Sequence, residues 1–283
     1  MDTGTHLLVG FDGTFEADRA LRWAVREAGL RRLPLTLCHA WRWPYPATYI
    51  DHNAAAIVRR MGEHLLDHGV RRARELDPGL TVRKRLMSGP AYSALLHLSG
   101  DAELIVVGSR PPDEVPPGST ALRVPAKAVR PTIVVRAAHV RHRRVVAGFD
   151  GSAAGDAALE FAVREAVLRG ARLCVVQGCW EPGGAETGDL ALYADEDKLR
   201  RVFGERLERA VAPWRERYPA VRVETALLLE PPRRALFAAA DSADLVVVGD
   251  RGIGGTRPDG LGLIAAAVLQ HAPCTVAVVP AAA

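Results

Sequence analysis

Glycines at a fixed spacing follow an apolar run near the carboxyl end of the chain. Gly249, Gly252 and Gly262 form the pattern G-x2-G-x9-G, and a helical pattern comes next. Glycine lets backbone amides approach an anion closely, and a helix amino terminus adds free N–H groups and a favourable dipole. Arg251 and Arg257 could add charge-assisted contacts. The pattern predicts a phosphate-binding loop, and the alternative is a flexible glycine-rich loop that binds nothing.

An acidic residue closes an earlier strand in the same half of the chain. Asp150 is followed by Gly151 and Ser152, where a helix is expected to begin. The carboxylate could accept a hydrogen bond from a ribose hydroxyl or from a magnesium-bound water. Asp and Ser are also common in Asx turns and helix caps, and the two roles can coexist. Asp12 is the same case in the first half.

The chain contains one unit twice. The tetrapeptide GFDG stands at Gly10–Gly13 and again at Gly148–Gly151, 138 residues later. The runs AELIVVGSR (from Ala102) and ADLVVVGDR (from Ala243) recur at an offset of 141 residues. A slowly drifting offset indicates a duplication with small loop insertions. We therefore predict two domains, residues 1–137 and 144–283, joined by the basic linker Ala137–Arg144.

Each half alternates short apolar runs with stretches of helical period. The runs LIVVG and LVVVG are continuously apolar, which is typical of strands that helices cover on both faces. We therefore predict an α/β fold in which each half is a doubly wound, five-stranded parallel sheet. The first half is expected to end with a helix over Ser119–Val129 and a strand over Thr132–Arg136. Ligands of such sheets bind beyond the carboxyl ends of the strands.

These motifs together resemble the universal stress protein family in its tandem two-domain form. The resemblance rests on Gly-Phe-Asp-Gly-Ser, on AVREA in the first helix, and on VVGDRG followed by GLGLIAAAVLQHAPCTVAVV, and it covers essentially the whole chain. It implies a Rossmann-like fold of the adenine-nucleotide alpha-hydrolase type in each domain. In nucleotide-binding members it implies ATP, with or without Mg²⁺. The expected binding residues are Asp150, Gly151, Gln177, Gly178, Gly249, Arg251, Gly252, Gly262 and Leu263, with adenine beside Gln177–Gly178.

Two departures from the family pattern stand in the binding loops. Leu263 replaces the Ser or Thr whose hydroxyl should meet a phosphate, which removes one hydrogen bond worth about 1 kcal/mol. The first copy departs further, because Pro111 replaces the second glycine and its loop is three residues shorter. Prolines donate no backbone hydrogen bond, and Asp113 and Glu114 are expected to repel phosphate. We expect this copy to have lost nucleotide binding or to hold something less anionic, with Asp12, Gly108, Gly118 and Ser119 as its weaker site.

Other classes of function find little support. No apolar run approaches the ~20 residues of a membrane span, and the amino terminus lacks the features of a signal peptide, so we expect a cytoplasmic protein. Basic residues are spread among carboxylates, which disfavours nucleic-acid binding. His64 and His68 stand at i, i+4 but without a third ligand, so no metal site is expected. The four cysteines form no CxxC pair and are expected to be buried free thiols.

We expect a stress-response protein that binds ATP, mainly in its second domain, as a sensor or regulatory module. It is not expected to be an enzyme beyond slow ATP hydrolysis, because no catalytic base is placed near the loop. The alternatives are a scaffold or interaction protein with two degenerate sites and, third, a nucleotide-transforming enzyme. The resemblance also implies that the two domains pair through Thr132–Arg136 and Thr275–Val279, and that chains form homodimers.

Overall fold

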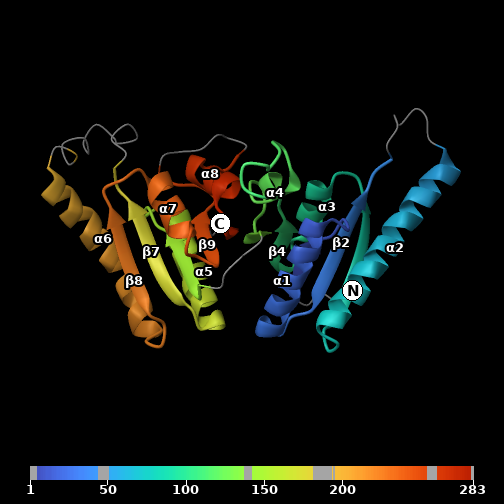
Figure 1. Cartoon of the computed structure of the whole chain (residues 1–283), viewed down its shortest axis with the longest axis horizontal. Coiled ribbons are helices and arrows are strands. Elements are labelled where there is room, and N and C mark those ends of the chain that lie inside the picture. The colour runs from blue at the N-terminus through green and yellow to red at the C-terminus, as the bar shows by residue number, and fades with distance from the viewer. Residues whose placement is uncertain are drawn as a thin grey trace. The chain divides into compact units, whose positions relative to one another are not determined.

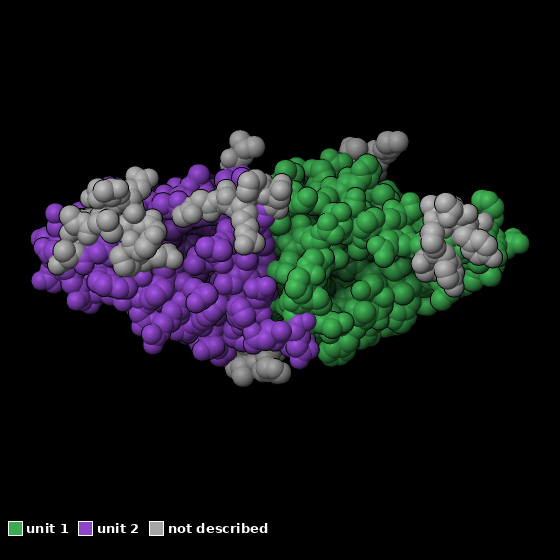
Figure 2. Space-filling model, turned by 90° about the horizontal axis from the view of Figure 1, so that it is seen from above, with its two compact units in different colours: residues 1–110, 115–136 green, residues 111–114, 137–283 purple. Residues whose placement is uncertain are grey.

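The chain divides into two compact units (Figure 2). Unit 1 contains residues 1–110 and 115–136, and unit 2 contains residues 111–114 and 137–283. The computed structural model describes residues 5–43, 51–136, 142–180, 193, 195–253 and 260–281. Most of the expected linker Ala137–Arg144 and the loop residue Arg257 lie outside the described residues.

Unit 1 contains a parallel sheet of five strands in the order β3-β2-β1-β4-β5. Helices α1 and α2 contact each other, and so do α3 and α4, as expected for two helical layers that flank one sheet (Figure 1). The strands are β1 (His6–Gly10), β2 (Leu35–Trp41), β3 (Val82–Ser88), β4 (Ala102–Gly108) and β5 (Thr132–Val135). The helices are α1 (Phe15–Arg31), α2 (His52–Leu76), α3 (Ala91–Leu98) and α4 (Thr120–Arg123).

Unit 2 repeats this arrangement with the strand order β8-β7-β6-β9-β10, again all parallel. The predicted fold class, an α/β fold with a doubly wound parallel sheet in each half, is therefore confirmed. The strands are β6 (Arg144–Gly148), β7 (Arg172–Gly178), β8 (Val223–Leu228), β9 (Leu245–Gly249) and β10 (Thr275–Val279). The helices are α5 (Ala153–Arg169), α6 (Glu196–Arg217), α7 (Pro232–Ala240) and α8 (Leu263–His271).

The core of each unit lies along its central strands. Ile105 and Val106 of β4 are fully buried, and so are Val246 and Val247 of β9. Successive side chains of a strand point to opposite faces of the sheet. Burial of consecutive residues therefore requires helices on both faces, which is why these runs are apolar throughout.

The strand order places a crevice at one point of each sheet. In unit 1, β1 pairs with β2 on one side and with β4 on the other. The chain connections leave β1 and β4 toward opposite faces, so the carboxyl ends of these two strands border an opening. In unit 2, β6 lies between β7 and β9 and creates the equivalent opening. Any ligand site of a unit is expected there.

Helix α4 is shorter than the sequence predicted. The expected helix over Ser119–Val129 is helical only over Thr120–Arg123 and continues as hydrogen-bonded turns to Ala128. Pro125 explains the difference, because proline has no N–H and its ring clashes with the carbonyl of the preceding turn. The counterpart in unit 2, α8, contains no proline and runs for nine residues.

Candidate functional site

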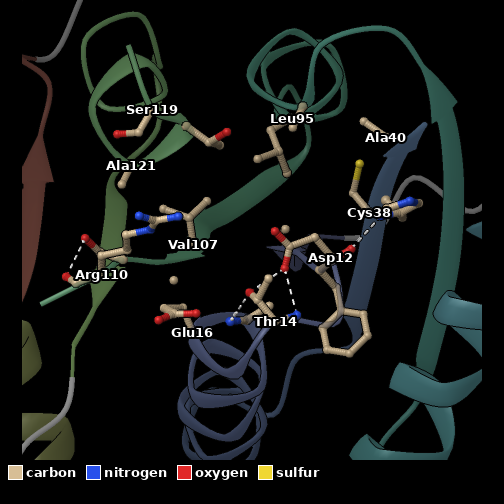
Figure 3. Close-up of a pocket in the computed structure, with 18 of the residues that line it drawn as sticks. Asp12, Thr14, Glu16, Cys38, Ala40, Leu95, Val107, Arg110, Ser119 and Ala121 are labelled. Carbon is tan, nitrogen blue, oxygen red and sulfur yellow. Dashed lines mark hydrogen bonds between the residues drawn. The ribbon is translucent and has the colours of Figure 1, made fainter. Parts of the chain in front are cut away.

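A cavity of about 360 Å³ opens at the carboxyl ends of β1, β2 and β4 in unit 1. Its polar rim comes from the start of α1 and from the loop after β4, and its apolar wall from α3, β4 and α4 (Figure 3). Its lining includes Asp12, Thr14, Glu16, Cys38, Leu95, Val107, Gly108, Arg110, Val115, Ser119 and Ala121. The cavity therefore lies at the switch point of the strand order, where the fold positions ligands.

Asp12 opens helix α1 through a compact turn. Its Oδ1 accepts hydrogen bonds from the backbone N–H of Thr14 at 3.1 Å and from the Thr14 hydroxyl at 2.6 Å. The Thr14 hydroxyl oxygen then caps the helix by accepting from the Ala17 N–H at 3.2 Å. Gly13 supplies the positive φ of 78° that this turn requires. Of the two roles that the sequence left open for Asp12, the turn is present, whereas the helix cap is Thr14.

Charged side chains of both signs and a buried thiol line the cavity. Glu16 and Arg110 both line it (Figure 3). The Oγ atom of Ser119 is buried and has no hydrogen-bond partner among the described residues. Burial raises the pKa of the Cys38 thiol to about 12, so this cysteine is a neutral part of the cavity wall at physiological pH.

Unit 2 uses the same turn at Asp150 and adds one contact. Oδ1 of Asp150 accepts from the N–H of Ser152 at 2.9 Å and from its hydroxyl at 2.6 Å. Oδ2 accepts from the N–H of Ile253 at 3.0 Å. The glycine loop is thereby fastened to the end of β6. At the offset of this loop, Ile253 corresponds to Pro112, which has no N–H to donate.

The glycines of the second loop lie close to neighbouring atoms, and at Gly252 a side chain would collide. A Cβ on Gly252 would lie 2.6 Å from Oδ2 of Asp150. A Cβ on Gly262 would lie 3.5 Å from the N of Gly252. The Gly262 N–H donates to the carbonyl of Asp250 at 2.8 Å. The first turn of α8 therefore lies beside the start of the loop.

The amino terminus of α8 is open. Gly262 is its N-cap residue, and no side chain caps the helix. The Leu263 side chain is 78% exposed, so it covers none of the core. The Nε of Arg251 lies 3.4 Å from Asp250, and more than half of its side chain is exposed.

An arginine from a distant helix reaches the start of α5. Arg206 of α6 donates from its guanidinium to the carbonyl of Gly151 at 3.0 Å. Gly151 has a φ of 76°, and a Cβ there would collide with this guanidinium. In unit 1 the neighbour of the equivalent Gly13 is Leu65. Sequence reasoning missed Arg206, because nothing in the sequence signals that α6 contacts this turn.

Gln177 and Gly178 end strand β7 beside β6. The side chain of Gln177 is 3% exposed, and its Oε1 has no hydrogen-bond partner among the described residues. A Cβ on Gly178 would lie 2.6 Å from the backbone of Pro232, so the start of α7 covers this glycine. The pair supplies a buried acceptor close to the crevice of unit 2.

The sequence of each unit matches the model of the universal stress protein family, over residues 5–136 and 141–280. The chain belongs to the universal stress protein family. A universal stress protein of Mycolicibacterium smegmatis is 32% identical over 287 residues, which cover 96% of both chains. One of Mycobacterium tuberculosis is 31% identical and covers 94% of this chain and 93% of its own. A crystal structure of a universal stress protein from Archaeoglobus fulgidus has a TM-score of 0.69 at 17% identity, with 97% and 98% of the two chains covered.

In this universal stress protein most of the residues predicted for the weaker site line the cavity of unit 1. Asp12, Gly108 and Ser119 line the cavity of unit 1, whereas Gly118 does not. Asp113 and Glu114, which were expected to repel phosphate, are not lining residues either. The negative charge at this cavity comes instead from Asp12 and Glu16. Glu16 was missed, although its difference from Ala154 could have been found by aligning the two copies at the offset of 138.

The carboxylates of the long helix α2 face basic partners. Glu63 lies 3.5 Å from Arg59, and Asp67 pairs with Lys84. The Lys84 hydrogen bond, with Arg71 and His64 nearby, holds the pKa of Asp67 below its usual value. No group of three or more His, Cys, Asp or Glu side chains that could hold a metal ion occurs within the described residues.

None of the helices that the structure describes combines the length and apolar character needed to cross a bilayer.

Proposed function

We propose that this universal stress protein binds ATP in unit 2 and acts as a stress-response sensor or regulatory module. The observation that carries the proposal is the convergence of Asp150, Gly252 and the open amino terminus of α8 at one crevice. A carboxylate, a glycine that lies against it and free helix amides together suit a ribose and its phosphates.

The phosphates are proposed to lie at the start of α8. The helix has nine residues, and its N-cap Gly262 brings no side chain that could compete for the first-turn N–H groups. The helix dipole favours an anion at this end. Arg251 and Arg206 supply positive charge from the loop and from α6. Leu263 contributes its backbone N–H only.

The adenine is proposed to lie toward Gln177. Oε1 of this buried side chain has no described partner, and a buried acceptor that stays unsatisfied costs about 1–3 kcal/mol. An exocyclic amine is a donor that would relieve this cost. The ribose would then approach Asp150, whose Oδ2 can accept a second hydrogen bond beside that from Ile253.

Binding without efficient turnover is part of the proposal. Asp150 is already engaged by Ser152 and Ile253, and Asp250 at the start of the loop pairs with Arg251. Any hydrolysis is therefore expected to be slow, with or without Mg²⁺. A cytoplasmic location, pairing of the two repeats through their last strands and formation of homodimers are also proposed from the sequence.

The proposal is tested by calorimetric titration of the full chain with ATP, before and after the substitution Gly252→Pro. Proline removes the N–H at this position and places a ring against Asp150, so binding should be lost while circular dichroism still reports the fold. Unchanged binding by Gly252→Pro would place the nucleotide elsewhere. No heat at millimolar ATP would favour a scaffold protein with two degenerate sites.

A further inference from the structure

We propose that the cavity of unit 1 binds an uncharged, hydroxyl-bearing ring compound of nucleoside size, and that Glu16 excludes phosphorylated ligands from it. The inference extends the proposed function by giving the two repeats different ligands, and it needs ATP binding in unit 2 only as a comparison. The inference rests on differences between equivalent residues in two crevices that have the same fold.

Glu16 of unit 1 and Ala154 of unit 2 occupy equivalent positions. Each is the second residue of its helix, after the N-caps Thr14 and Ser152. A Cβ on Gly108 would meet the backbone of Glu16 at 2.3 Å, and one on Gly249 would meet the backbone of Ala154 at 2.8 Å. The same strand end therefore rests on the same helical turn in both units. Unit 1 has a carboxylate where unit 2 has a methyl group.

The carboxylate of Glu16 is not neutralised within the described part of unit 1. Glu16 lines the cavity, and its side chain forms no hydrogen bond or ion pair with another described residue. It stands in the first turn of α1, where a helix dipole favours negative charge. A phosphate at this helix start would meet a full negative charge at close range, and such pairs repel strongly in a partly enclosed site.

Asp12 adds a second acceptor that unit 1 leaves open. Its Oδ1 is used by Thr14, as in unit 2. Its Oδ2 receives no hydrogen bond from a described residue, because Pro112 replaces the donor Ile253. Two carboxylates with free oxygens suit a ligand that donates hydrogen bonds, such as the vicinal hydroxyls of a sugar.

The cations are also placed differently in the two units. Leu65 of unit 1 stands against Gly13, where unit 2 places the guanidinium of Arg206 against Gly151. Arg110 lines the unit 1 cavity, but unit 2 has Arg251 at the matching position. Asp250, which replaces Ser109, gives unit 2 a further carboxylate, and Arg251 pairs with it at 3.4 Å. Arg19 donates to the carbonyl of Ser109 beside the unit 1 cavity, where unit 2 has Ala157 at the matching position. The two crevices therefore differ in where their charges stand, with a carboxylate rather than a guanidinium beside the start of the helix in unit 1.

The rest of the cavity suits an uncharged ring. Leu95, Val107, Val115 and Ala121 supply an apolar wall, and the Cys38 thiol stays neutral. The buried Oγ of Ser119 is a polar group that awaits a partner. The volume of about 360 Å³ falls within the range of small-molecule sites, which is roughly 300–1,000 Å³. A ring with hydroxyl groups at one end could pack against the apolar wall and donate hydrogen bonds to the carboxylates of Asp12 and Glu16.

The test uses the full chain carrying Gly252→Pro, so that unit 2 does not contribute, and titrates it with adenosine, AMP and ATP by calorimetry. Adenosine is expected to bind, and AMP and ATP to bind at least about tenfold more weakly, which corresponds to about 1.4 kcal/mol. Adding Glu16→Ala should tighten AMP binding and so reduce the ratio of the adenosine and AMP affinities by about tenfold. Titrations with and without Mg²⁺ show whether a bound cation screens the repulsion between Glu16 and the phosphate.

Matched variants keep the outcome specific to unit 1. Asp12→Ala should abolish adenosine binding, whereas Asp150→Ala should leave it unchanged. Ala154→Glu, introduced into the otherwise native chain, should weaken ATP binding by unit 2 at least tenfold. The inference would be overturned if the Gly252→Pro chain gave no heat of binding with adenosine, or if it bound adenosine and ATP with equal affinity. Loss of ATP binding by the native chain would instead contradict the proposed function alone.

Discussion

The backbone N–H of Ile253 donates a hydrogen bond to Oδ2 of Asp150 at 3.0 Å, which ties the glycine loop of unit 2 to the end of its first strand. Unit 1 cannot form this bond, because Pro112 stands at the matching position. One substitution in a duplicated scaffold thus changes how a loop closes and which carboxylate oxygens remain available to a ligand.

Asp150 is expected to be essential for ATP binding, and Asp12 is not. Hydrogen bonds to a charged group contribute about 1.5–3 kcal/mol, so Asp150→Ala should weaken ATP binding by roughly tenfold to a hundredfold. Asp12→Ala is the matched control and should leave the ATP affinity unchanged. Calorimetric titration of both variants checks the prediction. Equal losses of ATP affinity in the two variants would show that ATP binds to both units alike.

Gly252→Ala should weaken ATP binding without unfolding unit 2. The added Cβ would lie 2.6 Å from Oδ2 of Asp150 and must push the loop away from it. Gly204→Ala in helix α6 is the control, because a Cβ there meets only Leu227 at 3.8 Å. Removing a helical glycine should raise the free energy of unfolding by up to about 1 kcal/mol. Urea unfolding and ATP titration of both variants separate the two effects, and an unaffected ATP affinity in Gly252→Ala would contradict the role of the loop.

Leu263→Ser should strengthen ATP binding. The side chain is 78% exposed at the start of α8, so its removal costs little burial. A hydroxyl there could donate to a phosphate, and one such hydrogen bond contributes about 1 kcal/mol, or roughly fivefold in affinity. Leu263→Ala is the control and should bind ATP as the native chain does. A gain in Leu263→Ala as large as that in Leu263→Ser would point to relief of crowding instead.

Cys38 should be unreactive in the native protein near neutral pH. Burial raises the pKa of its thiol to about 12, and the thiolate is the reactive form. Labelling with iodoacetamide at pH 7–9, followed by peptide mass spectrometry, should leave Cys38 unmodified until urea unfolds the chain. Because the pKa in the folded state exceeds the usual value of 9.0, this thiol destabilises the fold as pH rises from about 9 to 12. Rapid native-state labelling at pH 7.5 would contradict its burial.

Much of the fold could be predicted because local pattern and tertiary structure agree. The continuous apolar runs at Ile105 and Val246 require helices on both faces, and the structure places them there. The length of helix α4 was not predicted correctly. The apolar spacing after Ser119 indicates a longer helix, but Pro125 ends the regular helix early.

The candidate site was predictable where it depends on strand ends. Asp150 and Gly252 meet because parallel strands β6 and β9 end at the same edge of one sheet. Arg206 was not predictable, because its contact with Gly151 depends on how helix α6 packs. Glu16 was visible in the sequence, but its place in a cavity became clear only with the geometry of helix α1.

The most direct test of nucleotide binding by one unit is the number of ATP equivalents bound by the native chain. Ligand released from the purified, denatured protein is identified by mass spectrometry, and the emptied chain is then titrated with ATP by calorimetry. We predict an adenine nucleotide and a stoichiometry near one, which Gly252→Pro abolishes. Two equivalents of ATP with similar affinity, or no bound nucleotide and no heat at millimolar ATP, would contradict it.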